Sequence, residues 1–311
     1  MPLLEHDNQA KDLGYRNLAI ETDEPLILAA KQHVEELYKC TEDLQDRKFK
    51  SQAKSDFASC YSEMYFAAVA RHRLNLNPIH RSDAGPDLFL STIGCWAEIV
   101  TATDGASDAP NSLSKPKISD MSYDYPEEEI ILRLTSVLSD KSKKLLNDLS
   151  NNRIGIKPDQ LIVICINGGW LSEPMLCGIN EYPPIIKAVL EVGKRIYWRP
   201  VDDSDAPAYD QIGYRADIKK TKADGTEVDV PTGYFSSNEH SHISAVVFFT
   251  AYAGHPIERK KWGGDFITIH NPFAINKLNP GSFRCGIEYI VNANDKYIEI
   301  NAPIRHEVNK S

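Results

Sequence analysis

Two acidic residues, Asp87 and Glu98, lie on the two strands of a predicted β-hairpin, where they could bind a metal ion. Apolar runs at 88–90 and 95–100 flank a Ser-Thr-Ile-Gly turn, which is typical of an antiparallel hairpin. Asp87 opens the first strand, and Glu98 lies among apolar neighbours in the second, where an unpaired carboxylate is unfavourable to bury. Both positions fall near one end of the hairpin, and the register decides whether they share a face. Two carboxylates on one face can hold a hard divalent cation.

Two predicted helices must position the remaining charged residues of such a site. The first spans about 52–74, and Glu63 lies at the edge of its apolar stripe, either as a solvated carboxylate or as part of the site. The second spans about 127–150, and the spacing 134, 138, 141, 145, 149 places Lys141 on its inward face. An inward lysine needs an anionic partner or a route to water. Either Lys141 reaches the carboxylate pair, or it extends past the edge of the helix.

The ordered set of these residues resembles the PD-(D/E)XK nuclease-like superfamily, through Pro86-Asp87, Glu98-Ile99-Val100 and the helical acid Glu63. It looks closer to a little-characterised branch with Gly-Pro-Asp, Trp-x-Glu-x-Val, and a helix that opens Arg-x-Thr and bears a lysine. The matching residues here are Gly85-Pro86-Asp87, Trp96-Ala97-Glu98-Ile99-Val100, Arg133-Leu134-Thr135 and Lys141. Val100 stands where the superfamily has its lysine, and Lys141, on the following helix, would replace that lysine. The resemblance covers roughly residues 57 to 170.

The resemblance implies a divalent-metal-dependent nuclease that hydrolyses phosphodiester bonds of nucleic acid, with a DNA endonuclease as the first expectation. Asp87, Glu98 and the backbone carbonyl of Ile99 would then bind Mg²⁺ or Mn²⁺. Lys141 would orient the attacking water or stabilise charge on the phosphate, and Glu63 would complete the metal shell. Arg133 and Thr135, one turn earlier, are candidates to contact substrate phosphate.

Two alternatives remain open. One is a catalytically inactive binding or structural module of the same fold, which Val100 and the net charge of −9 favour, because proteins that depend on non-specific phosphate contacts are usually basic. Nucleic-acid binding therefore requires a local patch, for which Arg259 and Lys260, close to a tryptophan, are candidates. The other is an unrelated metal hydrolase that uses His240 and His242, which requires their rings to converge on a carboxylate.

The pattern of elements predicts an α/β fold with a mixed central sheet flanked by helices, and the resemblance implies a restriction-endonuclease-like arrangement. We expect an N-terminal helical arm (1–50), a nuclease-like core (51–200), a β-rich insertion (201–242) and C-terminal strands that complete the core (243–311). Core strands are expected at 86–91, 95–101, 161–166 and 244–250. Further expectations are a helix at 183–194 and an antiparallel β-rich C-terminal extension with a hairpin at 284–291 and 296–301.

Composition narrows the class of protein. Hydrophobic residues make up 42% and charged residues 25% of 311 residues, as in soluble globular proteins, and no apolar run approaches the roughly 20 residues of a membrane helix. The N-terminus lacks the features of a signal peptide, so a cytoplasmic location without membrane partners is expected. The six cysteines are scattered and predict reduced thiols. Phosphate-loop, nucleophile-elbow and zincin motifs are absent. A possible homodimer would suit cleavage of duplex DNA.

Overall fold

The computed structural model describes residues 2–80, 85–106, 109–113, 125–151, 155–157, 159–172, 182–198, 209–215, 217–222, 224–294 and 298–307. The fold is α/β, with a mixed sheet of eight strands in the order β1-β2-β3-β4-β9-β10-β11-β14. These strands are β1 (Pro78–His80), β2 (Leu88–Leu90), β3 (Cys95–Thr103), β4 (Leu161–Trp170), β9 (Ala245–Phe249), β10 (Ile267–His270), β11 (Gly286–Tyr289) and β14 (Ile304–His306). Strands β3, β4 and β9 run parallel, and β2 and β10 flank them in antiparallel pairing.

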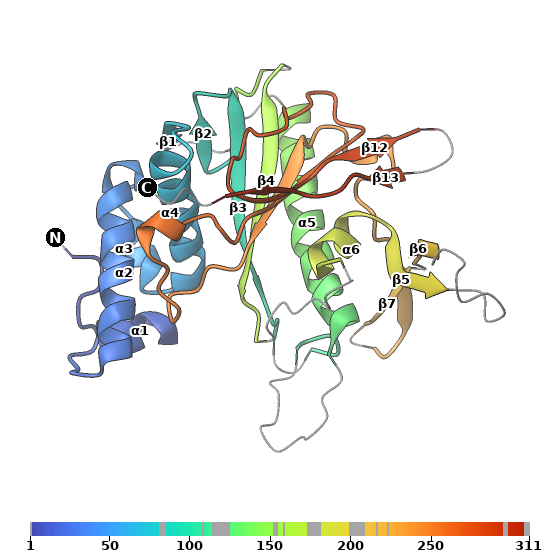
Figure 1. Cartoon of the computed structure of the whole chain (residues 1–311). Coiled ribbons are helices and arrows are strands. Elements are labelled where there is room, and N and C mark those ends of the chain that lie inside the picture. The colour runs from blue at the N-terminus through green and yellow to red at the C-terminus, as the bar shows by residue number, and fades with distance from the viewer. Residues whose placement is uncertain are drawn as a thin grey trace.

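Helices cover the two faces of this sheet in separate layers (Figure 1). The first layer contains α1 (Leu13–Ala19), α2 (Pro25–Thr41), α3 (Phe49–Ala53) and α4 (Phe57–His72), and the second contains α5 (Glu127–Ser150) and α6 (Pro184–Val189). Side chains of β3 point alternately toward the two helical layers: Ala97 and Ile99 pack with α4, whereas Trp96 packs with α5. This alternation places the side chain of Glu98 on the α5 side of the sheet.

Three small antiparallel sheets complete the described fold. They pair β5 (Val192–Trp198) with β6 (Tyr209–Tyr214), β7 (Ile218–Thr221) with β8 (Glu227–Val230), and β12 (Val291–Ala293) with β13 (Ile298–Ile300). Short 3₁₀ turns occur at Glu42–Leu44, Asn238–His240 and Arg259–Lys261. In the described part of the chain, every helix is too short or too polar to cross a bilayer.

Most of the predicted elements are confirmed, with three differences in extent. The helix expected at 52–74 begins at Phe57, because Asp56 caps it by accepting a hydrogen bond from the Ser59 amide (3.3 Å). The helix expected at 183–194 ends at Val189, where Leu190 adopts an extended backbone that leads into β5. The strand expected at 161–166 continues to Trp170.

The expected C-terminal hairpin is wrong in its first strand. Residues 286–289 form β11, which joins the main sheet parallel to β10 and antiparallel to β14, while only the residues from Val291 pair with β13. Gly286 explains the position of β11: it has φ +66°, and a Cβ there would lie 2.0 Å from the Phe266 carbonyl oxygen. Because only glycine permits this approach, the chain lies directly against β10. The C-terminal strands are therefore mixed in direction and not uniformly antiparallel.

Candidate active site

The short strand β2 leaves one edge of β3 uncovered. Their pairing ends at Leu88 and Ala97, whereas β3 continues to Thr103. Asp87 lies at this boundary, and its Oδ2 accepts a hydrogen bond from the Ile99 amide at 2.6 Å. The carbonyl of Ile99 points to the same edge as its amide, because both groups of a strand residue face one neighbour. The Asp87 carboxylate and the Ile99 carbonyl therefore lie on the same open edge of β3.

Glu98 is the residue before Ile99 on β3, and its side chain is completely buried. Its Oε1 accepts hydrogen bonds from the ammonium groups of Lys141 at 2.5 Å and Lys144 at 2.9 Å, both from α5. Its Oε2 is buried and has no hydrogen-bond partner in the described part of the chain. The inward lysine thus reaches a site carboxylate and does not extend past the edge of the helix. The unpaired oxygen is left available for a ligand.

Glu63 approaches from the opposite layer. The preceding residue, Ser62, holds α4 against the sheet: its Oγ lies 2.7 Å from the Thr101 hydroxyl and accepts a hydrogen bond from the Asn167 amide at 2.9 Å. Because Thr101 belongs to the uncovered part of β3, this contact brings Glu63 to the same edge as Asp87. At this edge, the negative charge of Asp87 raises the pKa of Glu63.

Two carboxylates of the site, those of Glu63 and Asp87, have pKa values above the ordinary range. Burial, followed by the charge of Asp87, raises the pKa of Glu63 to about 8. Burial and the charge of Glu98 raise the pKa of Asp87 to about 6, against the Ile99 hydrogen bond. Burial opposes the charge of Lys144, but the hydrogen bond and charge of Glu98 outweigh it and raise the pKa of that lysine. The two lysines therefore compensate Glu98 but leave Glu63 and Asp87 with unfavourable negative charge.

These features fit a hydrated Mg²⁺ or Mn²⁺. Such an ion takes oxygen ligands and retains several waters, and Asp87, Glu98 Oε2 and the Ile99 carbonyl are oxygen donors. Among the residues that the structure describes, no group of three or more His, Cys, Asp or Glu is arranged to enclose a metal. The atoms that could hold a cation here are the carboxylate oxygens of Asp87 and Glu98 and the Ile99 carbonyl oxygen, and a positive charge beside them would offset the negative charge of Glu63 and Asp87.

This geometry can be set beside known proteins. The chain matches no protein-family model, no curated protein and no solved structure.

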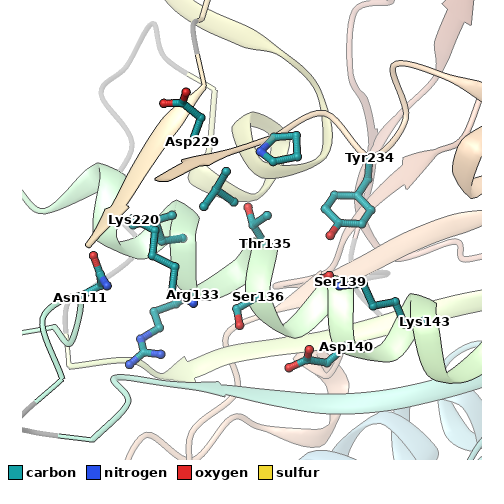
Figure 2. A pocket seen from close by; sticks show the side chains of 13 residues that line it. Asn111, Arg133, Thr135, Ser136, Ser139, Asp140, Lys143, Lys220, Asp229 and Tyr234 are labelled. Atoms are coloured by element: carbon teal, nitrogen blue, oxygen red, sulfur yellow. The ribbon is translucent and has the colours of Figure 1, made fainter. Parts of the chain in front are cut away.

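Arg133 and Thr135 lie away from the carboxylates. Both line a pocket on the outer side of α5, shown in Figure 2, whereas Lys141 and Lys144 face the sheet. Arg133 Nη2 also donates a hydrogen bond to the backbone carbonyl of Asp104 at 2.6 Å. The structure thus separates the two predicted phosphate contacts from the lysine that shares their helix.

Arg259 and Lys260 are also remote from the site. The Arg259 guanidinium donates to His72 Nδ1 at 2.9 Å, and Lys260 forms an ion pair with Glu258 at 2.9 Å. His72 is nine residues beyond Glu63 on α4, roughly 13 Å along the helix axis. An acidic partner already compensates Lys260, so the structure does not present these two residues as a free basic patch beside the carboxylates.

The histidine alternative does not meet its requirement. His240 Nδ1 and His242 Nε2 lie 3.0 and 3.3 Å from the hydroxyl of Ser142, so the rings converge on a serine and not on a carboxylate. The sequence analysis did not identify Lys144 as a second ion-pair partner of Glu98. Lys144 follows Lys141 by three residues, which places the two side chains close together on the helix. It also did not identify the hydrogen bond from the Asn167 side chain to Ser62 on α4. The position of Asn167 directly after the apolar run 161–166 could have indicated a buried polar contact.

Proposed function

We propose that this protein is a divalent-metal-dependent nuclease that hydrolyses phosphodiester bonds of nucleic acid, with DNA as the expected substrate. The observation that carries the proposal is the 2.5 Å contact between the Lys141 ammonium and the buried Glu98, beside Asp87 at an open sheet edge. In this proposal, Lys141 takes the role of the lysine that is missing at Val100, and its ion pair with Glu98 supports this. The α/β fold with a mixed sheet is compatible with the restriction-endonuclease-like arrangement that the sequence resemblance implies.

Each residue has a chemical role in this proposal. Asp87, Glu98 and the Ile99 carbonyl would hold Mg²⁺ or Mn²⁺. When bound, the ion would supply Lewis acidity toward water and the phosphate. Lys141 is placed to donate a hydrogen bond to the attacking water or to charge that develops on the phosphate. Glu63, whose pKa is about 8, can exchange a proton near neutral pH.

The proposal is tested by metal binding and cleavage on the same preparations. Calorimetry with Mn²⁺ and Mg²⁺ is run on the wild type, on Asp87→Ala, and on Asp224→Ala, which removes a carboxylate from an exposed turn. Cleavage is followed with a mixed pool of labelled DNA and RNA. We expect Asp87→Ala to lose both metal binding and metal-dependent cleavage while Asp224→Ala retains them. Unchanged binding and cleavage in Asp87→Ala would refute the proposed site.

A second candidate is a binding module in which the site no longer catalyses a reaction. Val100 and the double ion pair favour it, because Lys141 and Lys144 already compensate Glu98 without a cation. The same experiment separates the two functions: metal binding without cleavage of either nucleic acid supports the module. Absence of metal binding would make the carboxylates structural and remove the nuclease proposal.

A further inference from the structure

A pocket with a volume of about 350 Å³ lies between α5 and the β7–β8 hairpin; we call it the α5 pocket (Figure 2). Helix α5 contributes Ser136, Ser139 and Lys143 from its outer side, three and four residues apart as one helix face requires. Lys141 and Lys144 face Glu98 instead. The helix therefore serves two separate sites, and nothing in the nuclease proposal uses this one.

The charge around the α5 pocket is mainly positive. Arg133, Lys143 and Lys220 line it, and neither lysine forms a salt bridge within the described residues. Two acids, Asp140 and Asp229, also line it. Asp229 pairs with Lys219 in the hairpin register, so the side chains of these two residues share the face opposite to Lys220. In a chain with a net charge of −9, this local excess of cations favours an anionic ligand.

Two donors in the pocket lack acceptors. The Thr135 hydroxyl is buried without a partner in the described chain, and Thr135 as a whole is only 2% exposed. The Arg133 Nε is likewise buried and unpaired. An unsatisfied buried donor is unfavourable, and a ligand with acceptor oxygens would offset this cost. The pocket is thus electrically and chemically suited to a phosphate or carboxylate group.

Hydrogen bonds fix Arg133 and the neighbouring strand at the cationic end of the pocket. Arg133 is fixed by its hydrogen bond to the Asp104 carbonyl. Asn111 fixes the neighbouring strand: its Nδ2 donates to the Thr221 carbonyl at 2.6 Å and its Oδ1 accepts from the Thr221 amide at 3.0 Å. These contacts fix the backbone next to Lys220, whose exposed side chain lines the same end of the pocket as Arg133.

The opposite end offers an aromatic surface. Figure 2 shows Arg133, Lys220 and Asn111 at one end of the pocket and Tyr234 and Lys143 at the other. The apolar residues Leu132, Val230 and Pro231 also line it. An inorganic anion would use only the cationic end. A ligand that fills the whole pocket carries an anion at one end and a flat, partly apolar group at the other.

We propose that the α5 pocket binds a nucleoside monophosphate, with its phosphate at Arg133 and Lys220 and its base against Tyr234. Stacking of a base on an aromatic side chain is favourable for every base, because each base has a flat π face. The Asp140 carboxylate is available to accept hydrogen bonds from hydroxyl or amino groups of the nucleoside. This inference is independent of the metal site, because none of these residues contacts Glu98, Asp87 or Glu63.

The test is calorimetric titration of the full chain with the four ribonucleoside 5′-monophosphates and with inorganic phosphate. EDTA is present so that the metal site does not contribute. Lys220→Glu is compared with Lys219→Glu, which makes the same charge change on the other face of β7. Thr135→Val removes the unpaired hydroxyl at nearly constant shape.

We expect at least one nucleotide to bind more tightly than phosphate, with affinity reduced about tenfold or more in Lys220→Glu and little changed in Lys219→Glu. Weaker binding by Thr135→Val would place the ligand against α5. Three results would overturn the inference: no nucleotide binding by the wild type at millimolar concentration, equal losses in the two lysine variants, or phosphate binding as tight as nucleotide binding. None of these results bears on metal binding at Asp87.

Discussion

The central sheet buries two glutamates completely, and their surroundings differ. Glu288, on β11, accepts hydrogen bonds from His270 Nε2 at 2.7 Å and His306 Nε2 at 3.0 Å, and the Gly281 amide donates to both of its oxygens. Glu98, on β3, takes two lysines on one oxygen and has no described partner on the other. Both side chains are 0% exposed, so burial alone does not distinguish them.

The two glutamates differ in how fully the surrounding groups compensate the negative charge of their clusters. Burial acts to raise the pKa of Glu288, but the hydrogen bonds from His270, Gly281 and His306 outweigh it, and the pKa is lowered. Around Glu98, burial and the charges of neighbouring carboxylates raise the pKa values of Glu63 and Asp87, and the groups that act in the opposite direction do not outweigh them. The groups around Glu288 compensate its charge, whereas one oxygen of Glu98 has no partner in the described chain, and the cation that we propose would compensate it.

The largest contrast is expected from removing each glutamate. Glu288→Ala leaves buried His270 and the Gly281 amide without an acceptor, so we expect a loss of about 3–5 kcal/mol in the free energy of unfolding. Glu98→Ala releases lysines whose side chains are 24% and 45% exposed and can reach water, so we expect a loss of about 1 kcal/mol. Urea denaturation measures both. Equal losses would mean that Glu98 is as structural as Glu288.

A smaller effect, of opposite sign, is expected from Glu63→Gln. Because folding raises the pKa of Glu63 from 4.5 to about 8, the folded state holds its proton more tightly, and stability is lost as pH rises between these values. In metal-free buffer at pH 8, Glu63→Gln should therefore raise the free energy of unfolding by roughly 1–3 kcal/mol, and at pH 4 by little. Thermal unfolding across this pH range is the measurement. A destabilised variant at pH 8 would show that Glu63 is compensated after all.

The smallest change in stability is expected from the two lysines. Lys141→Ala and Lys144→Ala each remove one partly exposed lysine and leave the other paired with the buried Glu98, so each should change the free energy of unfolding by about 1 kcal/mol or less. Their effects on cleavage should differ: we expect a loss of about 100-fold for Lys141→Ala and under about tenfold for Lys144→Ala. Single-turnover cleavage at saturating Mn²⁺ separates the two. Equal losses would assign both ammonium groups to the reaction.

The sequence predicts the elements that carry the site because their patterns are local. The apolar run of β4, the hairpin of β2 and β3, and the inward position of Lys141 in α5 all follow from periodicity, and the structure confirms each of them. The pairing of Lys141 with Glu98 was one of two open outcomes. The burial of Glu98 between the sheet and α5 favours this pairing, because a buried carboxylate is unfavourable without a positively charged partner such as the Lys141 ammonium.

Long-range pairing is the part that the sequence could not supply. The parallel position of β11 beside β10 depends on the close approach at Gly286, which periodicity does not report. Likewise, the His72 partner of Arg259 lies 187 residues away in the chain, so the sequence does not reveal it. The acidic partner of Lys260 is Glu258, only two residues away, and this local pairing was overlooked when the basic run was interpreted. The α5 pocket is formed by segments more than a hundred residues apart, such as Asn111 and Thr221.

Gly105 and Arg133 also limit how this protein can diverge. Gly105 has φ +90°, and a Cβ at this position would lie 1.1 Å from Arg133 Nη2. Any larger residue at 105 would have to displace the guanidinium that forms one end of the α5 pocket, besides adopting a strained backbone. The two positions should therefore change together in evolution. In homologous chains, loss of the glycine should accompany a shorter residue at 133 and, with it, loss of the cationic end of the pocket.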